Sequence, residues 1–235
     1  MQTLDRSMTV AQIVATHPTC ARVFQNHRID FCCRGGVSVE EACRSQGVDA
    51  QAVYAELERV IDEGRGGEDR DFAAMTSSAL IAYIVERHHA YLRRAIPWIA
   101  QMASKVARVH GAHNPKLPDL HATYGDLVNL LLDHLDHEEQ VLFPALLSNA
   151  GAREVVAREL HEMHRDHLVV GEMLQRIRAL SDDFTVPEWG CGSYRALLGE
   201  LEKMEEDILR HVHLENHVLM PRHQPPEGAD AGHHH

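Results

Sequence analysis

The chain has 235 residues, of which 44% are hydrophobic and only 5% aromatic, and its formal net charge at pH 7 is −12 with histidine neutral. This charge disfavours nucleic acids and anionic membranes as partners, because both are negatively charged. No apolar run approaches the roughly 18 residues of a membrane-spanning helix, and no hydrophobic signal segment is present at the N-terminus, so we expect a cytoplasmic protein.

Residues 1–65 are expected to form a small helical domain. Thr9 can cap a first helix, and the segment Ser38–Glu41 has the capping-box pattern that opens another. Asp49 can cap a third helix, which carries an apolar stripe on one face. The glycine-rich segment 64–70 then predicts a linker and a domain boundary.

A second domain, at residues 75–222, is expected to be a four-helix bundle. Pro97 should kink its first helix, and Pro144 should disturb the last turn of its second. The connecting loops are short, which is typical of an up-down-up-down arrangement, and no segment has a sustained strand period. The sequence therefore predicts an all-α protein, with long helices at about residues 77–109, 119–147, 152–180 and 193–220.

One pattern occurs twice, in the second and in the fourth long helix. His134–Pro144 and His211–Pro221 each contain a histidine, a glutamate four residues later, a Val-Leu pair, and a proline ten residues after the histidine. Residues four apart lie on the same face of a helix, so each glutamate, Glu138 or Glu215, should project beside its histidine. Two such pairs meeting inside a bundle predict a symmetric metal site.

The first helix of each half of the bundle is expected to add one histidine to this site. His88 precedes His134 by 46 residues and His167 precedes His211 by 44, which favours His167, but loop lengths can absorb such differences. Four imidazoles and two bridging carboxylates would suit borderline divalent metals, with iron the best fit and manganese or zinc as alternatives. The residues alone leave as candidates His88 or His89 in one half and His161, His164 or His167 in the other.

The small domain contains a second motif, Asp30–Gly36, with adjacent thiols at Cys32 and Cys33. The chain has five cysteines, and an odd number without an export signal indicates reduced thiols. Vicinal thiols in a glycine-rich turn can bind a soft metal or take part in thiol exchange, and the alternative is two small buried residues at a turn. The predicted linker separates this motif in sequence from the metal site.

The two motifs together resemble the repair of iron centres family, whose members are di-iron proteins that repair iron–sulfur clusters. The resemblance covers nearly the whole chain: an Asp-Phe-Cys-Cys motif in a short N-terminal domain, then a hemerythrin-like bundle with the two signatures His134–Pro144 and His211–Pro221. Arg34 replaces a usual glycine of the family, and Met220 replaces a phenylalanine. By this resemblance His89 and His164 stay outside the site, and the implied ligands are His88, His134, Glu138, His167, His211 and Glu215.

The resemblance implies a protein that repairs clusters damaged by nitric oxide or peroxide. Iron would be donated from a pair of oxo- or hydroxo-bridged iron ions, and Cys32 and Cys33 would assist the transfer. The expected partners are damaged iron–sulfur proteins and small ligands such as NO or O₂, and a homodimer is left open. Two alternatives remain: a hemerythrin-like sensor that binds O₂ or NO, and an enzyme that reduces NO at the two irons.

Overall fold

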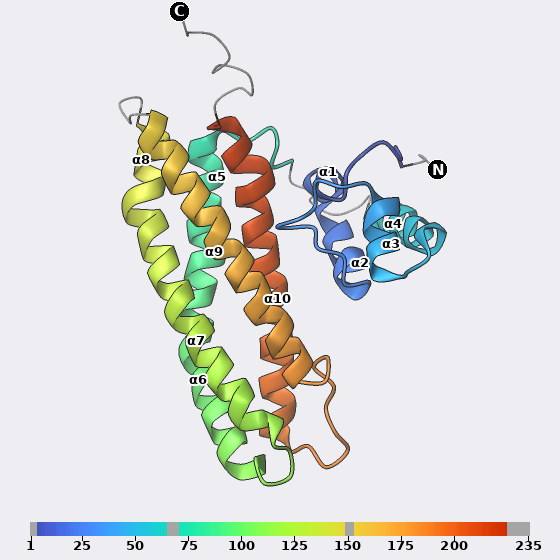
Figure 1. Ribbon diagram of the computed structural model, residues 1–235, viewed down its shortest axis with the longest axis vertical. Coiled ribbons are helices and arrows are strands. Elements are labelled where there is room, and N and C mark those ends of the chain that lie inside the picture. The colour runs from blue at the N-terminus through green and yellow to red at the C-terminus, as the bar shows by residue number, and fades with distance from the viewer. Residues whose placement is uncertain (1–3, 65–70, 149–152, 225–235) are drawn as a thin grey trace, which may run out of the picture.

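The computed structural model describes residues 4–64, 71–148 and 153–224. Within these ranges every regular element is helical, and one isolated antiparallel bridge joins Thr9 to Ser38. Figure 1 shows a long bundle with a small domain packed against its side, near one end. The predicted all-α fold is therefore confirmed, whereas residues 65–70, most of the predicted linker, lie outside the described residues.

The small domain begins its helices at the caps that the sequence suggested. Thr9 and Gln12 form a reciprocal capping box, the Ser38 hydroxyl accepts from the backbone N–H of Glu41, and the Asp49 carboxylate accepts from that of Gln51. Each bond satisfies a backbone donor that the first helical turn leaves free. The elements are α1 (Val10–Thr16), the 3₁₀ turn η1 (Pro18–Cys20), α2 (Ala21–Asn26), α3 (Val39–Gln46) and α4 (Ala50–Gly64).

The bundle is built from four long helical segments, three of which are interrupted. Pro97 lies inside α6 without ending it, and Pro144 lies in the first turn of α8. The first segment comprises α5 (Ser77–Ile84), η2 (Val85–His89) and α6 (Ala90–His110). The second comprises α7 (Lys116–His137), η3 (Glu138–Leu142) and α8 (Phe143–Leu147), and the third is α9 (Arg153–Leu180). The fourth comprises α10 (Gly192–Leu214), η4 (Glu215–Leu219) and η5 (Met220–Arg222).

The interruptions η2, η3 and η4 are π turns. In each, a backbone N–H bonds to the carbonyl five residues earlier, as from Phe143 to Glu138 and from Met220 to Glu215. A π turn inserts one residue into an α-helix, which rotates the downstream residues by about 100° relative to an unbroken helix. Val141, three residues after Glu138, is 43% exposed and Leu142 is fully buried, whereas the corresponding Val218 and Leu219 are both buried.

The small domain and the bundle share one continuous hydrophobic core. Polar contacts also join them: Asn216 Nδ2 donates to the Cys32 carbonyl at 2.8 Å, and His213 Nδ1 lies 3.1 Å from the Phe31 carbonyl. Farther along the bundle, Arg28 pairs with Asp183 at 2.8 Å. The motif loop of the small domain is thus docked on the bundle. Among the described residues, no helix has the length and apolar character needed to cross a membrane.

Candidate metal centre

Six buried side chains converge inside the end of the bundle that carries α5 and α8 (Figure 1). The π turns lie at this site, because Glu138 and Glu215 each begin one and His89 ends one. None of the six side chains belongs to a residue more than 6% exposed. The structure brings together His89 of η2, His134 of α7, Glu138 of η3, His167 of α9, His211 of α10 and Glu215 of η4.

The first half of the cluster is formed by His89 and His211. Their Nε2 atoms lie 3.2 Å apart. Glu138 Oε2 lies 3.5 Å from the His89 Nε2 and 3.9 Å from the His211 Nε2, and Glu215 Oε1 lies 2.8 Å from the latter. Two imidazole nitrogens and one oxygen from each glutamate therefore surround one position.

The second half is formed by His134 and His167, whose Nε2 atoms lie 3.1 Å apart. Glu138 Oε1 lies 3.2 Å from the His134 Nε2, and Glu215 Oε2 lies 3.2 Å from the His167 Nε2. Each glutamate thus presents one oxygen to each histidine pair. This arrangement would allow each carboxylate to bridge two cations.

The spacing and the polar chemistry of the cluster both fit divalent cations. When two imidazole nitrogens bind the same ion, each at about 2.1 Å, octahedral or tetrahedral angles place them about 3.0–3.4 Å apart. Both carboxylate oxygens of Glu138 and Oε2 of Glu215 are removed from solvent, have no well-aligned hydrogen-bond partner, and face histidine nitrogens at 3.2–3.9 Å. A buried carboxylate in that condition is costly unless a cation compensates it.

His88, which the family resemblance assigned as a ligand, lies outside this cluster. Its Nδ1 lies 3.0 Å from Asp207 Oδ1, and its ring stacks on that of His211 with centroids 5.7 Å apart. His89, expected to stay outside, is instead 1% exposed and joins the site. The physical reason is the π turn η2, which changes the face that each residue presents. The geometry therefore favours His89 over His88 as the candidate ligand.

One signal in the sequence could have indicated His89. His89 precedes His134 by 45 residues, and His167 precedes His211 by 44, so His89 fits the internal symmetry more closely than His88 does. The alternative His164 lies outside both halves of the cluster, and His161 does as well. Both line a hollow on the surface of the bundle that also contacts Cys33.

The outward nitrogens of three clustered histidines face oxygen acceptors. His89 Nδ1–H donates to Glu139 Oε1 at 2.8 Å, and His167 Nδ1–H donates to Asn216 Oδ1 at 2.9 Å. Each acceptor directly follows one of the two central glutamates, so the arrangement repeats in both halves. His134 Nδ1 is farther from its partner, at 3.7 Å from Asp166 Oδ2. These contacts leave Nε2 of each ring to face the metal position.

The electrostatics of the cluster reflect burial opposed by ion pairing. Burial works against protonation of His134, but the charge of Glu138 and the nearby carboxylate of Asp166 outweigh it, so the pKa of His134 lies well above its usual value. Burial also works against ionisation of Glu215, but His211 and His167 outweigh it and hold the pKa of Glu215 well below its usual value.

The Asp30–Gly36 motif lies directly against this centre, although it is far from it in sequence. Cys33 Sγ is 3.7 Å from the His167 carbonyl. Cys32 and Cys33 are free thiols, and the hydrogen bond to Cys33, together with burial, raises the pKa of Cys32 well above its usual value. Arg34 is exposed, so its bulk is accommodated, whereas a Cβ at Gly35 would lie 2.6 Å from the Phe31 carbonyl.

Comparisons with known proteins match both parts of the chain. Residues 6–61 match a domain of unknown function (DUF542), and residues 80–222 match the hemerythrin HHE cation binding domain. The iron-sulfur cluster repair proteins YtfE of Yersinia pseudotuberculosis (serotype IB, strain PB1/+) and Yersinia pestis (strain Pestoides F) are each 31% identical over 218 residues. Each alignment covers 92% of this chain and 96% of the relative. The chain therefore belongs to the family of YtfE-type iron–sulfur cluster repair proteins.

Proposed function

We propose that this protein holds two iron ions in the bundle and donates iron to damaged iron–sulfur clusters. The observation that carries the proposal is the sharing of both glutamates between two histidine pairs, which provides two adjacent metal positions. Nitrogen and carboxylate donors without sulfur suit iron. The relatives are named as cluster repair proteins, which supports delivery of the iron to iron–sulfur clusters.

The residues of the chain would bind, orient and release the iron that is passed on. His89 and His211 would hold one ion, His134 and His167 the other, and Glu138 and Glu215 would bridge them. Bridging carboxylates favour release, because their protonation weakens both metal positions together. The clients would be damaged iron–sulfur proteins, and the free thiols of the motif support a location in the reducing cytoplasm.

Two other functions share the same centre: reversible binding of O₂ or NO by a sensor, and reduction of NO at the two metals. We favour iron donation, because the thiol motif is docked beside His167. A sensor or a reductase that acts only inside the bundle would not need vicinal thiols at that place. The thiols would thus act in delivery and not in holding the metal pair.

The test compares iron transfer and NO consumption by the iron-loaded protein under the same anaerobic conditions. Iron should appear in an apo iron–sulfur acceptor faster than from free iron at equal concentration, and NO should not be turned over catalytically. The Cys32→Ser, Cys33→Ser variant should keep its iron and its visible absorption but transfer iron more slowly. Catalytic NO consumption without iron transfer would overturn the proposal, and an unchanged transfer rate in the variant would remove the thiols from it.

A further inference from the structure

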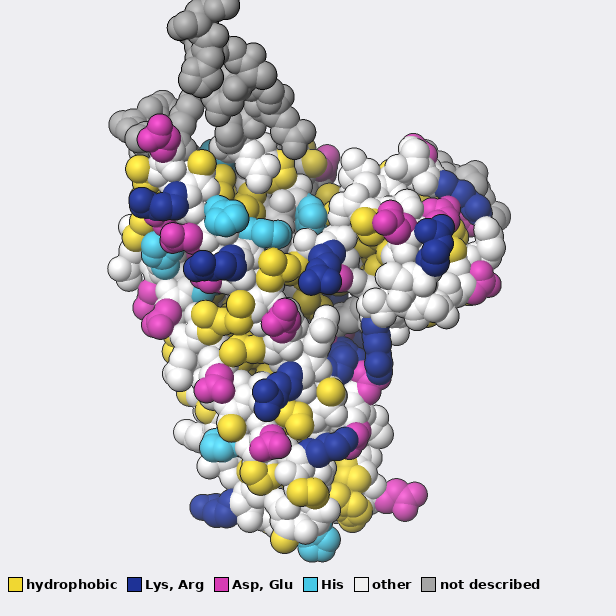
Figure 2. Space-filling model, viewed as in Figure 1, with side chains coloured by type: hydrophobic (Ala, Val, Ile, Leu, Met, Phe, Trp, Pro, Cys, Tyr) yellow, Lys and Arg dark blue, Asp and Glu magenta, His cyan; other side chains and the backbone are white. Residues whose placement is uncertain are grey.

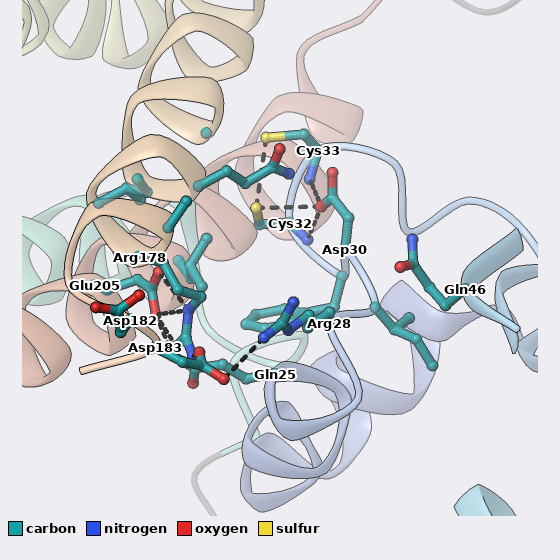
Figure 3. Close-up of a pocket in the computed structure, with 17 residues that line it drawn as sticks. Gln25, Arg28, Asp30, Cys32, Cys33, Gln46, Arg178, Asp182, Asp183 and Glu205 are labelled. Carbon is teal, nitrogen blue, oxygen red and sulfur yellow. Dashed lines mark hydrogen bonds and ion pairs between the residues drawn. The ribbon is translucent and has the colours of Figure 1, made fainter. Parts of the chain in front are cut away.

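Three potential donor groups gather in the docked motif, outside the bundle. A carboxylate oxygen of Asp30 and the sulfur atoms of Cys32 and Cys33 all lie within 4.8 Å of one another. The Cys32 Sγ is 3.4 Å from the Cys33 Sγ and 3.4 Å from Asp30 Oδ1. Figure 3 shows the two sulfur atoms side by side, with the Asp30 carboxylate next to them.

These separations are close to those of three ligands around one ion. Metal–sulfur bonds of about 2.3 Å and metal–oxygen bonds of about 2.1 Å give ligand-to-ligand distances of about 3.6–3.8 Å in a tetrahedron. Small side-chain rotations would therefore bring the three groups to bonding distance of a common ion. The backbone N–H groups of Cys32 and Cys33 both donate to Asp30 Oδ1, at 3.0 and 2.8 Å, and so fix the carboxylate near the thiols.

The motif opens onto a hollow of about 640 Å³ between the small domain and the bundle (Figure 3). This space can admit a fourth ligand, from water or from a client protein. Figure 2 shows the small domain projecting from the side of the bundle, with charged side chains around the junction. Most charged groups of the wall are paired with one another or with Lys116: Arg178 with Asp183 and Glu205, Arg28 with Asp183, and Lys116 with Asp182. The charged residues of that wall are Asp30, Asp182, Asp183 and Glu205, against Arg28 and Arg178.

We propose that Asp30, Cys32 and Cys33 form a third cation site, which transiently holds one thiophilic divalent cation. Two thiolates and one carboxylate suit soft to borderline ions such as Fe²⁺, Co²⁺ or Zn²⁺. On binding, each thiol loses its proton to solvent and each sulfur donates an electron pair to the metal, with no change of oxidation state.

The position of this site also indicates where its iron comes from. Cys33 contacts the backbone of His167, and the Asn216 side chain bonds to both the His167 ring and the Cys32 carbonyl. The nearest bundle position is therefore the one formed by His134 and His167, and it feeds the third site. This receiving role rests on the proposed function, whereas the binding of a cation by the motif does not.

The experiment adds Co²⁺ to the full-length protein whose bundle is already loaded with iron. One further equivalent should bind, with a thiolate-to-cobalt charge-transfer band in the near ultraviolet and release of about two protons. Cys32→Ser, Cys33→Ser should abolish the band. Asp30→Asn, whose amide oxygen can still accept the two backbone bonds, should weaken cobalt binding at least about tenfold.

Cys191→Ser is the matched control, because Cys191 is an exposed thiol 3.2 Å from His110 Nε2 and could bind cobalt independently. The thiolate-to-cobalt band of Cys191→Ser should be as strong as that of the unaltered chain. Absence of the band in the unaltered chain, or its persistence in the double-serine variant, would overturn the site, and unchanged affinity in Asp30→Asn would overturn the three-ligand assignment. Thermal unfolding of each variant establishes that it is folded.

Iron analysis of the same samples separates this inference from the proposed function. A bundle that holds no iron, in a chain that still binds cobalt at the motif, would contradict the proposed function and leave the third site standing. Equal rates of iron transfer by Asp30→Asn and by the unaltered protein would overturn the receiving role.

Discussion

At the scale of single residues, the adjacent histidines His88 and His89 have different surroundings. The Nε2 atom of His89 faces the cluster, and its Nδ1 atom faces Glu139. His88 bonds to Asp207 instead. We expect His89→Ala to lower the iron content from about two ions per chain to about one or less, because one position loses half of its imidazole ligands. His88→Ala should keep its iron and lose about 1–3 kcal/mol of unfolding free energy, because Asp207 loses its partner. Elemental analysis of both variants tests this, and iron loss in His88→Ala alone would restore His88 as the ligand.

Glu138 supplies the second test at this scale, because both of its oxygens face histidines of different pairs. Replacement by glutamine keeps the size of the side chain but removes the negative charge that a bridging ligand contributes. Glu138→Gln should therefore reduce iron at both positions, to less than about one ion per chain. Glu159→Gln is the matched control, since Glu159 is also buried but pairs with His137 and Arg158, outside the centre. Equal iron content in the two variants would exclude a bridging role for Glu138.

At the scale of elements, the π turns allow one helical segment both to bury its apolar side chains and to direct its polar side chains into the candidate metal centre. Leu80 and Ile84 of α5 are fully buried before η2, and His89 enters the site at its end. Deleting Arg87, an exposed residue of η2, would restore a plain α-helix and force either the apolar face of α5 or His89 out of place. We expect loss of iron and a fall of more than about 5 °C in the unfolding temperature. Arg87→Ala, which keeps the residue count, should change neither quantity, and a deletion variant with normal iron and stability would contradict the role of the turn.

The same turns mark the limit of what the sequence could predict. Caps at Thr9, Ser38 and Asp49 are local hydrogen bonds, so a few residues were enough to place those helices. The repeated His-x-x-x-Glu spacing likewise indicated His134, Glu138, His211 and Glu215, because residues four apart remain neighbours. A π turn depends on tertiary packing and has no comparable local pattern, so the α-helical period alone could not place His89.

At the scale of the whole molecule, the unexpected feature is the docking of the motif loop on the bundle. The sequence predicted two domains joined at 64–70, and distance along the chain concealed that Cys33 contacts His167. Contacts between Phe31 and His213, and between Arg28 and Asp183, hold the loop at two further points. Such contacts join residues more than a hundred positions apart, and neither periodicity nor spacing reports them. The arrangement places the thiols beside the backbone of His167, next to the candidate metal centre.

Asn216 joins the metal centre to the motif, and its two bonds can be separated by substitution. Its Oδ1 accepts from His167 Nδ1–H, and its Nδ2 donates to the Cys32 carbonyl. Asn216→Asp keeps the acceptor for His167, as Glu139 does for His89 in the other half, but loses the donor and places a negative charge beside a carbonyl. We expect this variant to retain its iron while alkylation of Cys32 and Cys33 becomes several times faster, because the loop undocks more often.

Asn216→Ala removes both bonds and should combine faster alkylation with about 10- to 100-fold weaker metal binding, the usual cost of losing a partner that orients a ligating histidine. The measurements are the rate of iron loss to a chelator and the rate of iodoacetamide labelling at each cysteine, followed by mass spectrometry. Labelling of Cys43, which is buried within the small domain, reports whether that domain stays folded. If Asn216→Asp releases iron as fast as Asn216→Ala, the bond to Cys32 and not the one to His167 supports the centre, and docking itself stabilises the bound metal.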